Sequence, residues 1–376
     1  MIPLFQPDMP TADELVPYLR QMDHDKWYTN FGPRLASFEE LLAQQFNVNR
    51  SKIVTLTSAT AGLTVALRLS LSKLRKTGSP FRQNFTCLLP AWTFVASAQA
   101  VLEAGGQPIF CDVDPVSGAL TPSLVEEYLQ NSNNPHPDII MPVAPFGAEI
   151  DVRLWDEFSE EKSIPVVVDA AASFCSLTPG NSPAVVSLHA TKIFGVGEGG
   201  FVVTKDIALA KRIREYTTFG FCGRRVAGVQ GGNYKLSEYH AAVGLAQFDR
   251  FLTIKSKNLK SRERYVKALS EIPNVRLLKG EAGKYATTFN VIVENLLAKD
   301  VVRNLKNAGI DAGIWWEDIL PQNPLFNSLS RNNISMFPVS ASLYTQVLGV
   351  PFSPFLSEFD IKKVAIKLKH ISESGS

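Results

Sequence analysis

Residues Ser187 to Gly200 read SLHATKIFGVGEGG, and the interpretation of the whole chain starts from this stretch. It contains one lysine, Lys192, among small, apolar and glycine residues, which is not the composition of a charged surface helix. Burial in such surroundings disfavours the ammonium form and raises the fraction of nucleophilic amine, as a lysine that forms a Schiff base requires. Taken alone, the stretch is equally compatible with a glycine-rich hairpin whose lysine faces water.

The segment just upstream favours the catalytic interpretation. Residues 163–174 read SIPVVVDAAASF, and their three consecutive valines predict a buried strand that ends on Asp169. In α/β proteins, ligands bind at the carboxyl ends of the strands. Lys192 and Asp169 are the pair that a pyridoxal 5'-phosphate enzyme requires, because the lysine bonds to the cofactor and the aspartate keeps its pyridine nitrogen protonated.

Two motifs give the chain a family resemblance over nearly its whole length. SLHATKIFGVGEGG is similar to S-F-H-x-T-K-x-x-x-x-G-E-G-G, and NYKLSEYHAA from Asn233 is similar to N-Y-R-M-[ST]-E-x-x-A-A. Both patterns belong to the DegT/DnrJ/EryC1/StrS family of pyridoxal phosphate-dependent nucleotide-sugar aminotransferases, which the chain therefore resembles. The resemblance implies the α/β fold of type I pyridoxal phosphate-dependent aminotransferases. We expect an N-terminal arm and a large cofactor-binding domain with a mainly parallel sheet between helices over residues 1–245, and a smaller C-terminal α/β domain over residues 246–376.

Composition excludes several other classes of protein. The 376 residues are 45% hydrophobic and 20% charged, as expected of a soluble globular protein of two or three domains. The formal charge of +2 is not the basic footprint of a nucleic-acid-binding protein, and no long Lys/Arg block suggests a membrane surface. Four widely spaced cysteines predict reduced thiols and a cytoplasmic location, and neither a signal peptide nor a membrane span is predicted.

Helix-start signals and strand patterns alternate along the chain. Thr11 as an N-cap, with Asp13 and Glu14 in the first turn, predicts one helix start. Ser37 with Glu40 predicts a capping box at the start of another helix. Residues 52–56 predict a strand, and a helix is expected from Thr60. The amide groups and dipole of that helix N-terminus favour a phosphate.

The resemblance assigns cofactor contacts to several of these positions. The family places S-G-T before this helix to bind the cofactor phosphate, and here Ala59 replaces the glycine and Thr60 follows. The resemblance implies that Ser187 also contacts the phosphate. Residues 90–94 match the family's P-x-x-[TS]-aromatic motif, which points to Phe94 as the ring on the cofactor face. Trp92 is the second candidate for that ring, and burial of both aromatics in the core is the alternative.

Other positions are assigned to the partner subunit or to substrate. The resemblance implies that Asn233 reaches the phosphate of a partner subunit, so that the protein is a homodimer with shared active sites. Asn30 and Phe31 are candidates for a substrate pocket, often that of the neighbouring subunit, or for an aromatic plug. Trp315 lies near substrate or in the core, and His189 has a packing or orienting role.

One position departs from the family pattern, and no metal site is expected. Ala172 stands where the family commonly has Gln or His in contact with the cofactor, so Ser173 or water is expected to take that role. Asp112 and Asp114 belong to an ordinary turn that closes a strand, and the histidines lack metal-ligand spacing.

The resulting functional prediction is a ping-pong transamination. Glutamate gives its amino group to the cofactor, which becomes pyridoxamine 5'-phosphate and then aminates a nucleotide-linked keto-deoxysugar. The resemblance places this reaction in surface polysaccharide synthesis, such as that of lipopolysaccharide O-antigen, or in that of another glycan. One alternative is a pyridoxamine phosphate-dependent sugar dehydratase, although such enzymes have histidine in place of Lys192. The other is a non-catalytic pyridoxal phosphate-binding or regulatory protein. The sugar, the nucleotide and the aminated carbon, 3 or 4, stay open.

Overall fold

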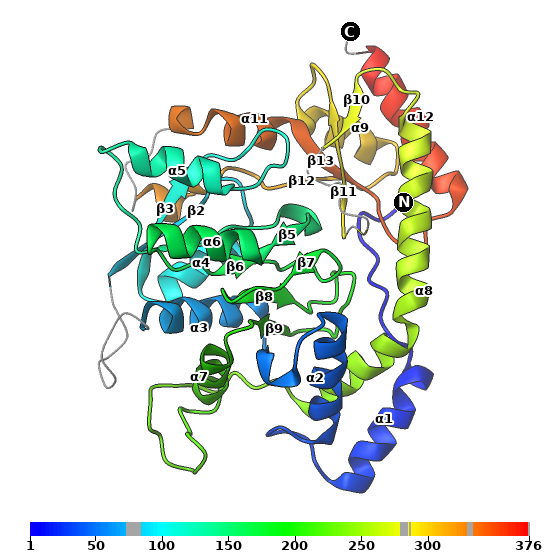
Figure 1. Cartoon of the computed structure of the whole chain (residues 1–376). Coiled ribbons are helices and arrows are strands. Elements are labelled where there is room, and N and C mark those ends of the chain that lie inside the picture. The colour runs from blue at the N-terminus through cyan, green and yellow to red at the C-terminus, as the bar shows by residue number, and fades with distance from the viewer. Residues whose placement is uncertain (73–83, 279–284, 286, 329–333, 375–376) are drawn as a thin grey trace.

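The computed structural model describes residues 1–72, 84–278, 285, 287–328 and 334–374 (Figure 1). A large central sheet lies between two layers of helices, and a smaller sheet with its own helices lies beside the end of a long helix. This is the α/β architecture with a large and a small unit that the sequence predicts.

Among the described residues, seven strands form the large sheet, in the order β1, β9, β8, β6, β4, β2, β3. Their bounds are β1 (Ile53–Leu56), β2 (Phe85–Pro90), β3 (Gly106–Cys111), β4 (Ile139–Ile140), β6 (Val168–Asp169), β8 (Ala184–Ser187) and β9 (Gly200–Val203). Parallel bridges from Ile140 to Val166 and from Val143 to Asp169 join β4 to β6. Only β9 runs antiparallel to its neighbours among these strands, so the prediction of a mainly parallel sheet is confirmed.

Helices cover both faces of this sheet, and neighbouring strand residues pack into different clusters. Val185 belongs to a core cluster with α3 (Ala59–Ser72), α4 (Val95–Glu103) and α7 (Ile207–Thr217). The next residue, Val186, belongs to a cluster with α2 (Pro33–Gln45), α5 (Pro122–Gln130), α6 (Val152–Lys162) and the first part of α8 (Glu238–Leu269). The valine runs are continuous because both faces of each strand are buried.

A smaller antiparallel sheet forms the second unit. Its strands are β10 (Val275–Leu277), β11 (Phe289–Val293), β13 (Val347–Val350) and β12 (Gly313–Ile314), in that order. They pack with α9 (Ala298–Asn307), α12 (Glu358–Ser374) and the end of α8 around a third core cluster. The remaining elements are α1 (Ala12–Asp25), α10 (Pro324–Asn327), α11 (Pro338–Gln346) and a two-stranded ladder of β5 (Ile150–Asp151) and β7 (Leu177–Thr178).

The chain crosses between the two units more than once. The predicted boundary between residues 245 and 246 falls inside α8, which is continuous over 32 residues. Leu245 packs in the large unit and Tyr265 in the small one. Ile2 packs in the small unit, whereas Phe326 returns to the core of the large unit. The division into residues 1–245 and 246–376 stays a prediction. Because the chain crosses between the units more than once, a single boundary separates them only approximately.

Local capping agrees with the sequence at one helix and differs at another. The predicted N-cap Thr11 is confirmed at the start of α1, where Thr11 and Glu14 also form a capping box. The capping box predicted at Ser37 is wrong, because α2 begins four residues earlier, at Pro33, and the Ser37 hydroxyl donates to the Pro33 carbonyl oxygen. The Glu238 carboxylate accepts from the first backbone N–H groups of α2 instead. Because Glu238 lies 203 residues after Leu35 in the chain, the sequence around the start of α2 does not reveal this cap.

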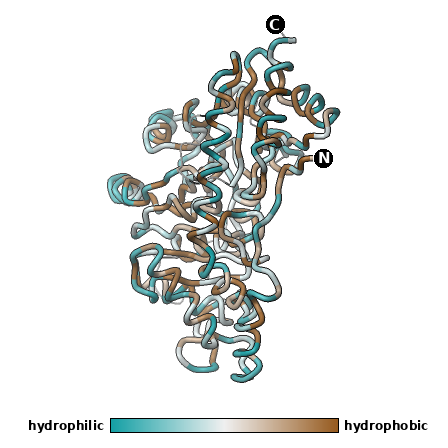
Figure 2. The backbone as a smooth tube through the Cα atoms, turned by 90° about the vertical axis from the view of Figure 1, so that its right-hand side faces the viewer, coloured by the Kyte–Doolittle hydropathy of each residue, from teal (hydrophilic) through white to brown (hydrophobic). Residues whose placement is uncertain are grey.

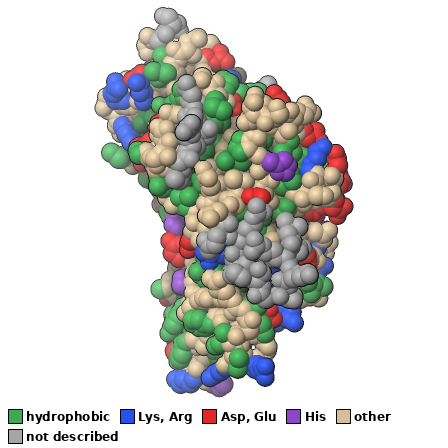
Figure 3. Space-filling view, turned by 90° about the vertical axis from the view of Figure 1, so that its left-hand side faces the viewer, with side chains coloured by type: hydrophobic (Ala, Val, Ile, Leu, Met, Phe, Trp, Pro, Cys, Tyr) green, Lys and Arg blue, Asp and Glu red, His purple; other side chains and the backbone are tan. Residues whose placement is uncertain are grey.

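Hydrophobic and hydrophilic stretches alternate along the trace (Figure 2). No helix within the described ranges is long and apolar enough to cross a membrane. On the face shown in Figure 3, basic and acidic side chains both occur around the edge, with uncharged side chains between them.

Candidate active site

Lys192 lies in a loop that folds back on itself between β8 and β9. The backbone N–H of Ala190 donates to the Gly197 carbonyl oxygen at 2.9 Å, and that of Lys192 donates to the His189 carbonyl oxygen at 2.9 Å. A Cβ on Gly195 would lie 2.8 Å from the Ala190 Cα, so only glycine fits there. Burial lowers the pKa of Lys192, while the charge of Asp169 opposes that shift.

Asp169 ends β6, and only 5% of its surface is exposed. The Ser97 hydroxyl donates to its Oδ2 at 2.7 Å, and the Ala171 backbone N–H donates to its Oδ1 at 3.1 Å. Burial raises the pKa of this carboxyl, and the two hydrogen bonds and Lys192 act against that rise. A cation placed next to Asp169 would therefore find a partly desolvated, oriented carboxylate.

A cavity of about 440 Å³ brings most of the predicted residues together. The predicted residues that line it are Ala59, Thr60, Phe94, Asp169, Ser187, His189, Lys192 and Trp315. Ala172 lines it as well, whereas Ser173 is fully buried and donates to the Ala148 carbonyl oxygen. Ser173 therefore does not take the role expected of it.

The N-terminus of α3 forms one end of the cavity. Ser58, Ala59 and Thr60 line it at the point where β9 passes closest. A Cβ on Gly200 would lie 2.5 Å from the Ala59 backbone nitrogen and 2.8 Å from the Ser58 carbonyl carbon. Gly200 thus allows a close approach that keeps the first turn of α3 at the cavity, where its free N–H groups attract an anion.

Replacing Gly200 by alanine is expected to destabilise the protein by about 1–3 kcal/mol, because backbone rather than a side-chain end must move. Gly228→Ala is the matched control, since the nearest atom to its added Cβ is the Cys222 Sγ at 3.1 Å in an exposed loop. Chemical unfolding of both variants measures the difference. Equal stability of the two variants would contradict the close approach described here.

Four predicted site residues do not line this cavity. Trp92 is 1% exposed and donates from its indole nitrogen to the Trp315 carbonyl oxygen at 2.9 Å, so its predicted place on the cofactor face is wrong. Asn30 and Asn233 are exposed on this chain, and the Phe31 ring lies under the Arg214 guanidinium at 5.4 Å. The roles predicted for these three at a partner's site stay predictions.

The cavity also has walls that the sequence did not indicate. Phe5, Phe146, Trp316, Glu198, Thr287 and Thr288 line it. Glu198 belongs to the quoted stretch of residues 187–200, and Trp316 follows Trp315 and shares its two predicted places, near substrate or in the core. No local pattern singles out Phe5 or Phe146. His189 hydrogen-bonds through Nδ1 to the Thr191 hydroxyl at 2.9 Å, and its Nε2 lies 3.7 Å from the Glu198 carboxylate.

The residues present fit pyridoxal 5'-phosphate. The cavity offers an amine of lowered pKa in Lys192, an oriented carboxylate in Asp169 and the helix N-terminus at Ala59. Phe94, which precedes α4 and is 55% exposed, presents a ring at the same cavity. These groups match an aldehyde, a pyridine nitrogen, a phosphate and an aromatic face.

The lowered pKa of Lys192 has a consequence for the cofactor-free protein. Between that pKa and the ordinary lysine value of about 10.4, the unfolded chain binds more protons than the folded one. The free energy of unfolding therefore rises with pH in this window, by at most about 1.4 kcal/mol per pH unit. Within this window, we expect the melting temperature of the wild type to rise relative to that of Lys192→Met as the pH increases. The same pH dependence in the two proteins would contradict a lowered pKa for the Lys192 amine.

The fold and this set of groups define a protein of the type I pyridoxal phosphate-dependent class. The chain belongs to the DegT/DnrJ/EryC1/StrS aminotransferase family, whose model matches residues 11–369. This confirms the family predicted from the two motifs.

Several relatives support the same placement. Protein Rv3402c of Mycobacterium tuberculosis is 31% identical over 69% of this chain, which spans 63% of that relative's length. The dTDP-4-amino-4,6-dideoxy-D-glucose transaminase of Shigella dysenteriae is 25% identical over 98% of this chain and 99% of its own. The solved structure of DesI with its TDP-sugar product has a TM-score of 0.86 at 24% identity, covering 100% of this chain and 93% of DesI. A putative pyridoxal phosphate-dependent aminotransferase from Bacillus cereus has a TM-score of 0.86, also at 24% identity, covering 98% of this chain and 99% of its own. These two structures confirm the predicted fold.

Proposed function

We propose that this protein is a pyridoxal phosphate-dependent aminotransferase that moves the amino group of glutamate to a nucleotide-linked keto-deoxysugar. Glutamate leaves as 2-oxoglutarate, and the ketone carbon of the sugar becomes an amine. The observation that carries the proposal is the shared cavity of Lys192 and Asp169, with burial lowering the pKa of the lysine amine. The names of the Shigella transaminase and of the DesI complex support the choice of substrate.

The chain's own residues have separate tasks in this reaction. When bound, pyridoxal phosphate supplies an aldehyde that bonds to amines and a ring that withdraws electrons from the bonded carbon. The Lys192 amine takes a proton at Nζ from the α-carbon of glutamate and, in the second half of the reaction, delivers a proton to the acceptor carbon that gains the amine. Asp169, held by Ser97 and the Ala171 N–H, keeps a positive charge on the ring nitrogen. The N-terminus of α3 holds the phosphate.

Lys192 separates this proposal from the two alternatives. The dehydratases considered above have histidine at this position, and here it is lysine. A binding-only protein has no need of an amine with lowered pKa directed into the same cavity as Asp169.

An absorbance experiment tests the function. The purified protein is loaded with pyridoxal phosphate, its cofactor band is recorded, and glutamate is added. We expect conversion to the pyridoxamine form and its reversal by one member of a panel of nucleotide-linked keto sugars. If the absorbance band of bound pyridoxal phosphate does not change after glutamate is added, the proposed function is wrong.

We also propose that the functional unit is a homodimer in which Asn233 of each chain serves the other chain's cavity. Asn233 is exposed and lies outside the cavity of its own chain. Its Oδ1 accepts from the Lys235 ammonium at 2.5 Å.

Mixing two inactive variants is expected to restore activity if sites are shared. A dimer of Lys192→Ala with Asn233→Ala has one doubly altered site and one intact site, because the intact lysine and asparagine meet across the interface. Random pairing makes half of the dimers mixed, so about a quarter of all sites recover. No recovery after unfolding and refolding the mixture would contradict shared sites, and refolded wild type is the control.

We further propose that the enzyme acts in the cytoplasm in the synthesis of a surface polysaccharide, such as lipopolysaccharide O-antigen. The relation to transaminases of deoxysugar nucleotides supports this. Loss of an amino sugar from the surface glycan of a strain that lacks the protein would test it.

A further inference from the structure

The first residues of the chain form a strap, Ile2–Asp8, that runs beside α8 (Figure 1). At one end Ile2 forms a parallel bridge with Ile310 of the small unit. At the other end the Arg250 guanidinium donates to the Asp8 carboxylate at 2.6 Å, and this carboxylate side chain is only 7% exposed. Because both ends are anchored, the residues between them have a defined position.

Phe5, in the middle of the strap, lies at the cavity. Its ring centroid is 5.5 Å from that of Trp315, which is 6.4 Å from that of Phe146. Phe146 stacks on Trp316 at 5.4 Å and 10°, and Trp316 lies 6.5 Å from Phe94. These five rings form a continuous aromatic wall that runs from the strap to the proposed cofactor ring contact.

The aromatic wall is chemically distinct from the rest of the cavity. The charged and titratable side chains among the described lining residues are Asp169, His189, Lys192 and Glu198, which come from the end of β6 and the 187–200 loop. The indole nitrogen of Trp315 is buried against Gly349, where an added Cβ would lie 2.4 Å from it, so this nitrogen offers no donor to a ligand in the cavity. The wall therefore offers ring faces, and these stack on apolar ring surfaces.

We propose that Phe5 is a specificity-determining residue for the amino-group acceptor. The aromatic wall receives the apolar face of the acceptor's sugar ring, so that deoxygenated sugars bind better than fully hydroxylated ones. A hydroxyl directed at the wall would lose its water without gaining a partner. The inference rests on the proposed function for the identity of the acceptor.

Equilibrium binding to the cofactor-free, full-length protein tests this, with intrinsic tryptophan fluorescence as the readout. The probes are dTDP-6-deoxyglucose, dTDP-glucose and dTDP alone, each also as the UDP compound. We expect the deoxy probe to bind more tightly than its hydroxylated counterpart. Phe5→Ala should raise the dissociation constant of the deoxy probe about tenfold, which corresponds to about 1.4 kcal/mol. It should raise that of dTDP-glucose less than about threefold.

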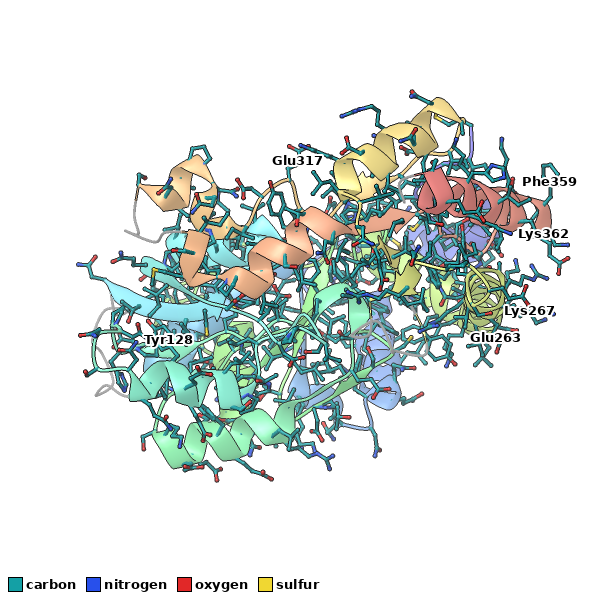
Figure 4. The ribbon with its side chains drawn as sticks, turned by 90° about the horizontal axis from the view of Figure 1, so that it is seen from above. Tyr128, Glu263, Lys267, Glu317, Phe359 and Lys362 are labelled. Atoms are coloured by element: carbon teal, nitrogen blue, oxygen red, sulfur yellow. The ribbon has the colours of Figure 1, made fainter. Side chains whose placement is uncertain are left out.

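Phe359→Ala is the matched control, because Phe359 is 75% exposed and points outward from α12 (Figure 4). It should bind all probes as the wild type does. Phe5→Leu removes the ring but keeps an apolar side chain of similar volume, so it tests the role of the ring if Phe5→Ala does not fold. Melting temperatures are measured for each variant. The leucine variant should also lose selectivity for the deoxy probe.

Three results would overturn the inference. The first is that Phe5→Ala weakens the binding of both sugar probes equally. The second is that it weakens the binding of dTDP alone to the same extent, which would place the nucleobase on the aromatic wall. The third is no measurable binding of any probe. Since the binding assay needs no cofactor, its outcome is separate from the glutamate-dependent absorbance change that tests the proposed function.

Discussion

Lys192→Ala is expected to lower the rate of transamination at least about 10³-fold, the largest effect of any single substitution in this chain. The variant loses both the amine that bonds to the cofactor and the base that moves the α-proton. Lys192 is the only lysine among the described residues that line the cavity, so no other amine there replaces it. Single-turnover kinetics with glutamate, followed by cofactor absorbance, give the measurement.

A covalent readout separates loss of chemistry from loss of binding. Borohydride reduction of the loaded wild type should leave the mass of the cofactor on the peptide that carries Lys192, and the alanine variant should carry none. Lys192→Arg is the control for charge, because arginine stays protonated and cannot act as the base. A variant at Lys192 that keeps more than about a tenth of wild-type activity would contradict the assignment.

Asp169→Asn is expected to cost about 10²–10³-fold in the same rate, because a neutral amide cannot hold a positive charge on the cofactor nitrogen. Asparagine keeps the size of the side chain and can still accept from the Ser97 hydroxyl, which now lies 2.7 Å from Asp169 Oδ2. The loss therefore reports on charge rather than on packing. Removing the carboxylate should also lower the pKa of Lys192 further, since Asp169 opposes the effect of burial on that amine.

Ser97→Ala provides the matched control for Asp169. It removes one hydrogen bond from the carboxylate and leaves the charge, so a loss of about tenfold or less is expected. If Asp169→Asn were no worse than Ser97→Ala, the carboxylate would be a structural group and the cofactor assignment would fail. Cofactor affinity measured by equilibrium dialysis completes the comparison.

Much of the fold was predictable because its signals are local. The valine run before Asp169 predicts a strand buried on both faces, and the capping box at Thr11 sets the start of α1. The glycine-rich stretch around Lys192 is compatible with a hairpin, and the structure has a loop there in which a Cβ on Gly195 would lie 2.8 Å from the Ala190 Cα. Each signal needs only neighbouring residues to be recognised.

The predictions that failed depend on distant parts of the chain. The start of α2 is fixed by Glu238, and the burial of Trp92 follows from packing against the loop that carries Trp315 and Trp316. Ser173 faces the Ala148 carbonyl rather than the cavity for the same kind of reason. No pattern within a short window contains this information.

The sequence by itself determined the family, the α/β fold, and the pairing of a lysine with an aspartate, because motif spacing and hydrophobic pattern are properties of the chain alone. Tertiary structure alone decided how burial raises the pKa of Asp169, how β9 approaches α3 at Gly200, and that Phe5 and Phe146 face the cavity. Those properties arise from desolvation and close contact between segments such as Phe5 and Trp315, which lie far apart in the chain and meet only when it folds.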